Sequence, residues 1–200
     1  MAPQLYLITP PEADPDTFPA LLMAVLSAAP FSALLVRRGS ADAPTYARLA
    51  AAVVQVGQGA GCAVLVEDDA ALARRIGADG VHVTTGIDEL KLAAAALKPD
   101  LIVGAGGLAT RDDAMTAGEF NADYLFFGPL DGSSDAEAAE LAQWWAETFE
   151  IPAVLSDPAA SAAAVDDRGA EFLALSTSLW SDPAPAQFTA AIAAALSVTA

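Results

Sequence analysis

The chain has 200 residues, of which 54% are hydrophobic, so it is long enough to bury a substantial core in a single domain. Its 26 acidic residues against 9 basic residues give a formal net charge of −17, which disfavours non-specific binding to nucleic acid or to an anionic membrane. No apolar run approaches the roughly 18 residues of a membrane-spanning helix, and the N-terminus lacks the pattern of a secretory signal, so we expect a cytoplasmic protein.

Short apolar runs of strand type alternate with alanine-rich segments of helical length along the chain. Eight runs are expected to be β-strands, at residues 4–8, 33–36, 63–66, 80–83, 101–103, 124–127, 153–155 and 172–175. Helices are expected, among other places, at residues 44–56, 70–76, 87–97, 111–119, 135–149 and 185–196. A strand and a helix repeated eight times predict a closed (β/α)8 TIM barrel, with residues 1–200 forming one domain.

An open, doubly wound parallel sheet is the alternative fold. Many such sheets carry a Gly-x-Gly-x-x-Gly turn directly after the first strand, where it binds a dinucleotide. Here Thr9, Pro10 and Pro11 stand at that place. The sequence therefore favours the barrel and gives no sign of a dinucleotide cofactor.

The polar residues after each strand form the candidate site, because ligands of such barrels bind at the carboxyl ends of the strands. Arg37 and Arg38 follow the second strand and are two of only 9 basic residues. The fork of N–H donors on Arg37 suits an anionic ligand. The competing interpretation is a surface arginine that forms ion pairs.

Carboxylates follow the third and fourth strands, at Glu67, Asp68 and Asp69 and then at Asp88. Asp68 and Asp88 could share a Mg²⁺ ion, which prefers oxygen ligands and screens a diphosphate leaving group. Alternatively, Asp68 or Asp69 caps the helix that begins near Ala70.

Three further features have a structural as well as a functional interpretation. His82 is the only histidine and lies inside the fourth strand, where a packed core residue facing inward or outward is commoner than a catalyst. Cys62 is the only cysteine, and we expect its side chain to pack in the core as a small hydrophobic residue. The glycines Gly106 and Gly107 after the fifth strand permit either close approach to a ligand or a tight turn.

The ends of the last two strands are where barrels of this kind commonly bind phosphate. The seventh strand ends in Asp157 and Pro158, a carboxylate and a residue without an N–H, which is unfavourable for phosphate. The eighth ends in Ser176, Thr177 and Ser178, whose hydroxyl groups can donate to an anion. We therefore expect one half of a phosphate site.

The segment EDDAALARRIGADGVHV, together with DLIVGAGGLAT and NADYLFFGPL, resembles the thiamine phosphate synthase family. The resemblance implies a TIM barrel that joins hydroxymethylpyrimidine diphosphate to thiazole phosphate, two small phosphorylated molecules, with Mg²⁺ as cofactor. It also implies that Arg37 contacts phosphate, that Asp68 binds the metal with Asp88 as a second ligand in a shifted loop, and that Ser133 lies in a substrate loop.

Several loop positions depart from the family's pattern. Gly106 and Leu108 stand where that pattern has Ser-x-His, a turn that the related thiazole tautomerases also need. Ala136 replaces a lysine, and Asp157 and Pro158 replace Gly-Gly. Because these residues would face the substrates, we expect synthase activity to be absent or several orders of magnitude below that of a family enzyme.

Two alternatives remain open at this point. One is a non-catalytic or regulatory barrel that binds a thiamine precursor or another small anion. A second is an unrelated small barrel that shares only the GADGV segment. Either could form a homo-oligomer, which the sequence neither requires nor excludes.

Overall fold

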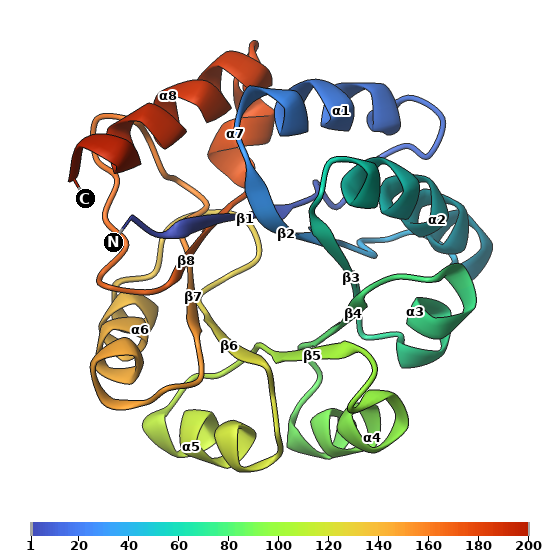
Figure 1. Ribbon diagram of the computed structural model, residues 1–200, viewed down its shortest axis with the longest axis vertical. Helices are drawn as coiled ribbons and strands as arrows, with labels where there is room; N and C mark the ends of the chain where they lie inside the picture. Colours follow the sequence, from blue (N-terminus) through green and yellow to red (C-terminus); the bar gives the residue numbers. More distant parts are fainter. Residues whose placement is uncertain (1, 200) are drawn as a thin grey trace.

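Eight parallel strands close into a barrel in the order of the chain in the computed structural model, which describes residues 2–199 (Figure 1). The strands are β1 (Gln4–Ile8), β2 (Phe31–Val36), β3 (Ala63–Glu67), β4 (Gly80–Val83), β5 (Ile102–Ala105), β6 (Tyr124–Phe127), β7 (Ala153–Ser156) and β8 (Phe172–Leu175). The helices are α1 (Phe18–Ala28), α2 (Ala43–Gly59), α3 (Ala70–Ile76), α4 (Ile87–Leu97), α5 (Arg111–Glu119), α6 (Ala136–Thr148), α7 (Thr177–Ser181) and α8 (Pro185–Thr199). The predicted (β/α)8 TIM barrel is confirmed.

Strand boundaries were least accurate at β5, which was expected at residues 101–103 and instead includes Gly104 and Ala105. Glycine has a low strand propensity, but Gly104 pairs with His82 on one side and with Tyr124 on the other. A Cβ atom at Gly104 would lie 2.0 Å from Cζ of Tyr124. The glycine is therefore required here to make room for the tyrosine ring inside the barrel.

The alternation of strand and helix has one exception, between β7 and β8. Residues 157–171 form turns and irregular loop and contain no α-helix. Pro158 lies at the start of this segment, and Arg168 and Gly169 have φ angles of 53° and 78° near its end, which an α-helix does not accommodate. The expectation of a helix after every strand is therefore wrong for β7, while two helices, α7 and α8, follow β8.

The core has two layers because successive strand residues face opposite sides of the barrel wall. The inner layer contains Tyr6, Ile8, Leu35, Leu65, Tyr124, Phe126, Val154 and Ala174. The outer layer packs between the strands and the surrounding helices, and Cys62 belongs to it. Burial raises the pKa of the Cys62 thiol to about 12, in agreement with the expected small hydrophobe.

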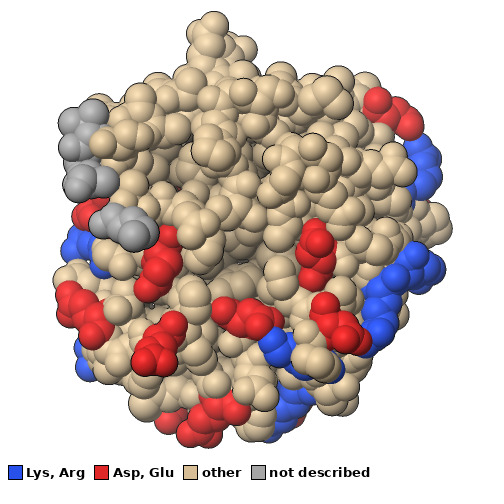
Figure 2. Space-filling view, in the orientation of Figure 1, with Lys and Arg blue, Asp and Glu red and all other residues tan. Residues whose placement is uncertain are grey.

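Charge is unevenly distributed over the surface. On the face drawn in Figure 2, acidic side chains lie mainly in the lower half, and few charged side chains cover α1 and α8 at the top. Neither helix contains Lys, Arg, Asp or Glu in its sequence. Over residues 2–199, no helix has both the length and the apolar character to cross a membrane.

Candidate functional site

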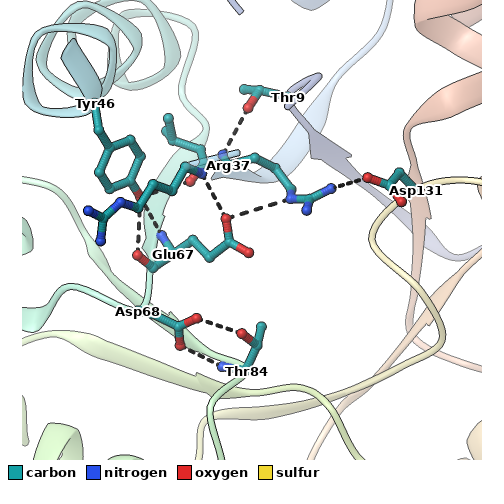
Figure 3. Close-up of polar contacts among 9 residues, drawn as sticks. Thr9, Arg37, Tyr46, Glu67, Asp68, Thr84 and Asp131 are labelled. Carbon is teal, nitrogen blue, oxygen red and sulfur yellow. Dashed lines mark hydrogen bonds and ion pairs between the residues drawn. The ribbon is translucent and has the colours of Figure 1, made fainter. Parts of the chain in front are cut away.

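Arg37 extends from the carboxyl end of β2 across the mouth of the barrel (Figure 3). Its backbone N–H donates to Oγ1 of Thr9 at 2.9 Å, and its Nη1 donates to Oδ2 of Asp131 at 2.7 Å. Its Nε lies 3.6 Å from Oε2 of Glu67, and the side chain is only 15% exposed. Arg37 thus lies where the sequence placed it, already engaged by carboxylates from two other elements.

Tyr46 fixes the ends of β2 and β3 relative to one another. Its buried hydroxyl accepts from the backbone N–H of Glu67 at 2.7 Å and donates to the carbonyl oxygen of Val36 at 3.0 Å. Burial raises the pKa of this phenol well above its usual value, so it stays protonated. Glu67 in turn accepts from the backbone N–H of Arg38 at 2.7 Å, which holds the residues around Arg37 in place.

The two acids after Glu67 have different roles. Oδ1 of Asp69 accepts from the backbone N–H of Leu72 at 2.7 Å, so Asp69 is the N-cap of α3. Asp68 points towards β4 instead, where its carboxylate accepts from the N–H and the hydroxyl of Thr84 at 2.7 and 2.5 Å. Asp68 also has a φ of 52°, a conformation that is unusual for a residue other than glycine. The capping alternative therefore applies to Asp69.

Replacing Asp69 with alanine is expected to lower the free energy of unfolding by about 1 kcal/mol, because one N–H of the first turn of α3 loses its acceptor. Urea denaturation of the wild type and the variant would measure this loss. Asp112, an exposed acid in the first turn of α5, gives a matched control, since its removal changes the charge equally without removing a cap. An equal effect of both substitutions would contradict the capping role.

Asp88 lies in the first turn of α4, with a side chain that is 89% exposed. Its Oδ1 is 3.5 Å from Nζ of Lys91, and none of the contacts found over residues 2–199 joins it to Asp68. The same residues contain no group of three or more His, Cys, Asp or Glu side chains that could hold a metal ion. A Mg²⁺ ion at Asp68 would thus need oxygen ligands from a bound molecule.

The turn after β8 meets the loop between β6 and α6. Oγ1 of Thr177 accepts from the N–H of Gly132 at 2.9 Å, and Ser133 follows in this loop as an exposed residue. The hydroxyl oxygens of Ser176 and Ser178 are buried and have no hydrogen-bond partner in the protein, like Nε of Arg37. Two hydroxyl groups after β8 therefore lack any partner, and Nε of Arg37 has only its ion pair with Glu67.

A cavity of about 420 Å³ lies beside this turn, a size that suits a small ligand. It is lined by Thr9, Pro10, Pro11, Leu130, Asp131, Gly132, Ser176, Thr177, Trp180 and Ser181. Asp157, at the end of β7, accepts from the hydroxyl of Ser134 and from the N–H of Ala159. The carboxylate that was expected to oppose phosphate is thus bonded to the β6–α6 loop.

His82 faces the interior of the barrel and is completely buried. Its Nδ1 is 2.8 Å from Oη of Tyr124, and its ring lies 4.9 Å from that of Phe126. Burial lowers the pKa of the imidazole to about 4, an effect that nearby Asp68 opposes and Arg37 assists. His82 is therefore neutral at physiological pH.

The sequence alone did not single out Asp131, Tyr46 or Tyr124. Asp131 occupies a loop without a recognisable motif, and Tyr46 belongs to the buried face of a helix. Tyr124 was assigned to the sixth strand with no inward direction. The available signal for Asp131 was the general expectation that an arginine at a crowded, acidic rim finds a carboxylate.

Comparison with known proteins gives a consistent result. A family model described as thiamine monophosphate synthase matches residues 5–179. A protein named thiamine-phosphate synthase from Hyphomonas neptunium is 38% identical over 190 residues, covering 88% of this chain and 86% of the relative. Another of that name, from Rhodospirillum centenum, is 35% identical over 190 residues, covering 90% and 91%.

Solved structures support the fold. A thiamine phosphate pyrophosphorylase from Pyrococcus furiosus superimposes with a TM-score of 0.80 at 20% sequence identity, covering 98% of this chain and 96% of that one. A structure named Native KDPGal has a TM-score of 0.76 at 18% identity, covering 98% and 95%. At such identities, these similarities show the barrel fold only.

Proposed function

This chain belongs to the thiamine monophosphate synthase family, and we propose that it catalyses the reaction of that family at the carboxyl ends of its barrel strands. In that reaction the thiazole nitrogen of thiazole phosphate bonds to the methylene carbon of hydroxymethylpyrimidine diphosphate, and pyrophosphate leaves. The observation that supports the proposal is the pair of buried hydroxyl groups without a hydrogen-bond partner after β8, on Ser176 and Ser178. A buried donor without an acceptor costs about 1–3 kcal/mol, so an anionic ligand would relieve this cost.

Each proposed residue has a definite task in this scheme. Arg37 would hold phosphate oxygens through its guanidinium fork. Ser176, Thr177 and Ser178 would donate hydroxyl hydrogens to the same or the second phosphate group, and Ser133 would contact substrate from the β6–α6 loop. The barrel would contribute mainly by orienting the two substrates for in-line attack.

Mg²⁺ fits at Asp68, since this ion is commonly held by one or two carboxylates together with substrate phosphates. When bound, Mg²⁺ would neutralise the charge of the diphosphate as it leaves. Asp68 would present its carboxylate by exchanging the hydroxyl hydrogen bond of Thr84 for the ion. Asp88 would join only through a shift of α4, because its side chain now points into solvent.

A coupled assay with both substrates and Mg²⁺ tests the proposal by measuring thiamine phosphate. We expect product to form several orders of magnitude more slowly than with a reference enzyme, because Gly106 and Ala136 lack the side-chain donors of the family's loops and Pro158 lacks a backbone N–H. The synthase from Hyphomonas neptunium is a suitable reference. Turnover equal to the reference would contradict the expected low rate, and complete absence of product would contradict the proposed reaction.

A non-catalytic anion-binding barrel is the second candidate function. The ion pair between Arg37 and Asp131, at a distance of 2.7 Å, argues against catalysis, because it leaves less positive charge on Arg37 to stabilise departing pyrophosphate. The unpartnered hydroxyl groups of Ser176 and Ser178 could still donate to an anion that does not react. Binding of thiazole phosphate or pyrophosphate without any product would support this candidate.

Asp131→Asn is expected to tighten pyrophosphate binding about tenfold, since the ligand no longer competes with a carboxylate for Nη1 of Arg37. Isothermal titration calorimetry with pyrophosphate and Mg²⁺ would measure the change. Asp112→Asn removes the same charge from exposed α5 and serves as the control. If both variants gained affinity equally, the effect would come from net charge and not from release of Arg37.

A further inference from the structure

A chain of three polar side chains runs through the interior of the barrel, apart from the ion pairs at its mouth. Oη of Tyr6 lies 3.0 Å from Oη of Tyr124, which lies 2.8 Å from Nδ1 of His82. The rings of His82 and Tyr124 are parallel within 5°, with centroids 5.7 Å apart. All three residues are buried, so these side chains are part of the core.

The other ring nitrogen of His82, Nε2, has no hydrogen-bond partner. Nε2 is buried and makes no hydrogen bond within the protein. It faces Gly106, which follows β5 at the carboxyl end of the barrel, and a Cβ atom at Gly106 would lie only 2.5 Å from Nε2. In this orientation, His82 is therefore compatible with glycine at residue 106 and not with a larger residue.

The hydrogen bonds among Tyr6, Tyr124 and His82 favour one tautomer of His82. The imidazole is completely buried, which disfavours its charged form, so only one ring nitrogen carries a proton. If Tyr6 donates to Tyr124 and Tyr124 donates to Nδ1, both hydroxyl hydrogens are used and the proton of His82 is on Nε2. In the reverse direction, the hydroxyl of Tyr6 would donate to no protein acceptor.

We propose that Tyr124 is a positioning residue that fixes His82 as the Nε2–H tautomer, and that Gly106 leaves this N–H free to donate to the pyrimidine diphosphate. The identity of the ligand rests on the function proposed above, whereas the tautomer does not. The acceptor is a ring nitrogen or a diphosphate oxygen, since both accept from a neutral N–H donor. An unpartnered buried donor is otherwise unfavourable, and this one faces Gly106 at the carboxyl end of the barrel, the end at which ligands of such barrels bind, so it points to a ligand contact.

The tautomer is measurable in the full-length protein because the chain contains a single histidine. Long-range ¹H–¹⁵N NMR spectra of protein labelled with ¹⁵N-histidine, free of any histidine tag, would show at pH 7 which nitrogen is protonated. We expect the Nε2–H form in the wild type and in Tyr6→Phe, and a mixture of tautomers in Tyr124→Phe. An Nδ1–H form in the wild type, or an unchanged tautomer in Tyr124→Phe, would overturn the proposal.

The ligand contact is tested by titrating the wild type with hydroxymethylpyrimidine diphosphate, with hydroxymethylpyrimidine and with pyrophosphate. A shift of the Nε2–H signal by the unphosphorylated pyrimidine identifies a ring nitrogen as acceptor, and a shift by pyrophosphate identifies an oxygen. We expect Tyr124→Phe to weaken binding of the diphosphate about tenfold and Tyr6→Phe to leave it nearly unchanged. Gly106→Ala should weaken it as well, because its Cβ atom displaces the imidazole.

The outcomes separate this inference from the proposed function. Binding of pyrimidine diphosphate that leaves the Nε2–H signal unmoved would overturn the ligand contact while the proposed function stands. If none of the ligands binds, the proposed function fails together with the contact, and the tautomer spectra alone decide the positioning role of Tyr124. Thermal unfolding of each variant would confirm that the compared proteins are folded.

Discussion

Replacing Arg37 with alanine is expected to lower kcat/KM by about 10²- to 10³-fold, the loss that follows removal of one well-placed group that stabilises developing charge. Arg37 is the arginine whose guanidinium lies over the barrel mouth, 15% exposed and directed at the β6–α6 loop (Figure 3). In a chain with 26 acids and 9 bases, few other cations are available to replace it. Steady-state kinetics at saturating Mg²⁺ would measure the change.

Arg38 provides a closely matched control for this substitution. It is the next residue in the chain and exposed, and its contact with Glu67 uses the backbone N–H, which alanine retains. Arg38→Ala should therefore change kcat/KM less than threefold or so, as expected for an exposed charge outside the site. Arg37→Lys should recover only part of the activity, because lysine keeps the charge but not the fork. Equal losses in Arg37→Ala and Arg38→Ala would contradict the assigned role.

Should the wild type form no product, the same variants still give a result by calorimetry with pyrophosphate. Arg37→Ala is then expected to weaken binding at least tenfold, since it removes the principal cation of the proposed site. Undiminished affinity in that variant would show that anions bind elsewhere on the protein.

The free energy of unfolding is expected to fall by about 3 kcal/mol between pH 6.5 and pH 4 through His82 alone. The pKa of this imidazole is about 4 in the folded protein, because burial disfavours the charged ring, and about 6.5 in the unfolded chain. Between these values the unfolded state binds a proton that the folded state does not. Acidification therefore favours unfolding across this window and has no further effect through His82 below it.

The measurement is urea denaturation at several pH values in that window, compared with His82→Gln. The variant keeps a polar group beside Tyr124 but cannot titrate, so its stability should depend less steeply on pH than that of the wild type. The carboxylates titrate in both proteins, so their effects cancel in the comparison. Hydrogen bonds from Asp16 and Thr17 lower the pKa of Asp14, and hydrogen bonds from Thr45 lower that of Asp42, so these two acids affect stability at still lower pH. Parallel pH profiles for the two proteins would show that His82 takes up its proton equally well when folded.

Local pattern was sufficient to predict the barrel. Apolar runs of four to six residues separated by alanine-rich helical segments specify parallel strands and their covering helices, whatever the distant parts of the chain do. The carboxyl ends of parallel strands then share one end of the barrel, so Arg37, Asp68 and Ser176 could be placed near one another before any contact was known. The helix that the eightfold repeat predicts between β7 and β8 does not form, and Arg168 and Gly169 in that segment have positive φ angles that an α-helix does not accommodate.

The contacts of the site were decided by tertiary structure. Arg37 and Asp131 are 94 residues apart in sequence, and Tyr6 and Tyr124 are 118 residues apart. Asp68 and Asp69 are neighbours of one residue type, and only the φ of 52° at Asp68 turns one carboxylate towards β4 and leaves the other on α3. Composition and periodicity report short-range preferences, whereas closure of the barrel brings distant side chains within hydrogen-bonding distance. The sequence by itself therefore determined the scaffold and the end that carries the site, and the closed barrel determined which groups are paired and which are left for a ligand.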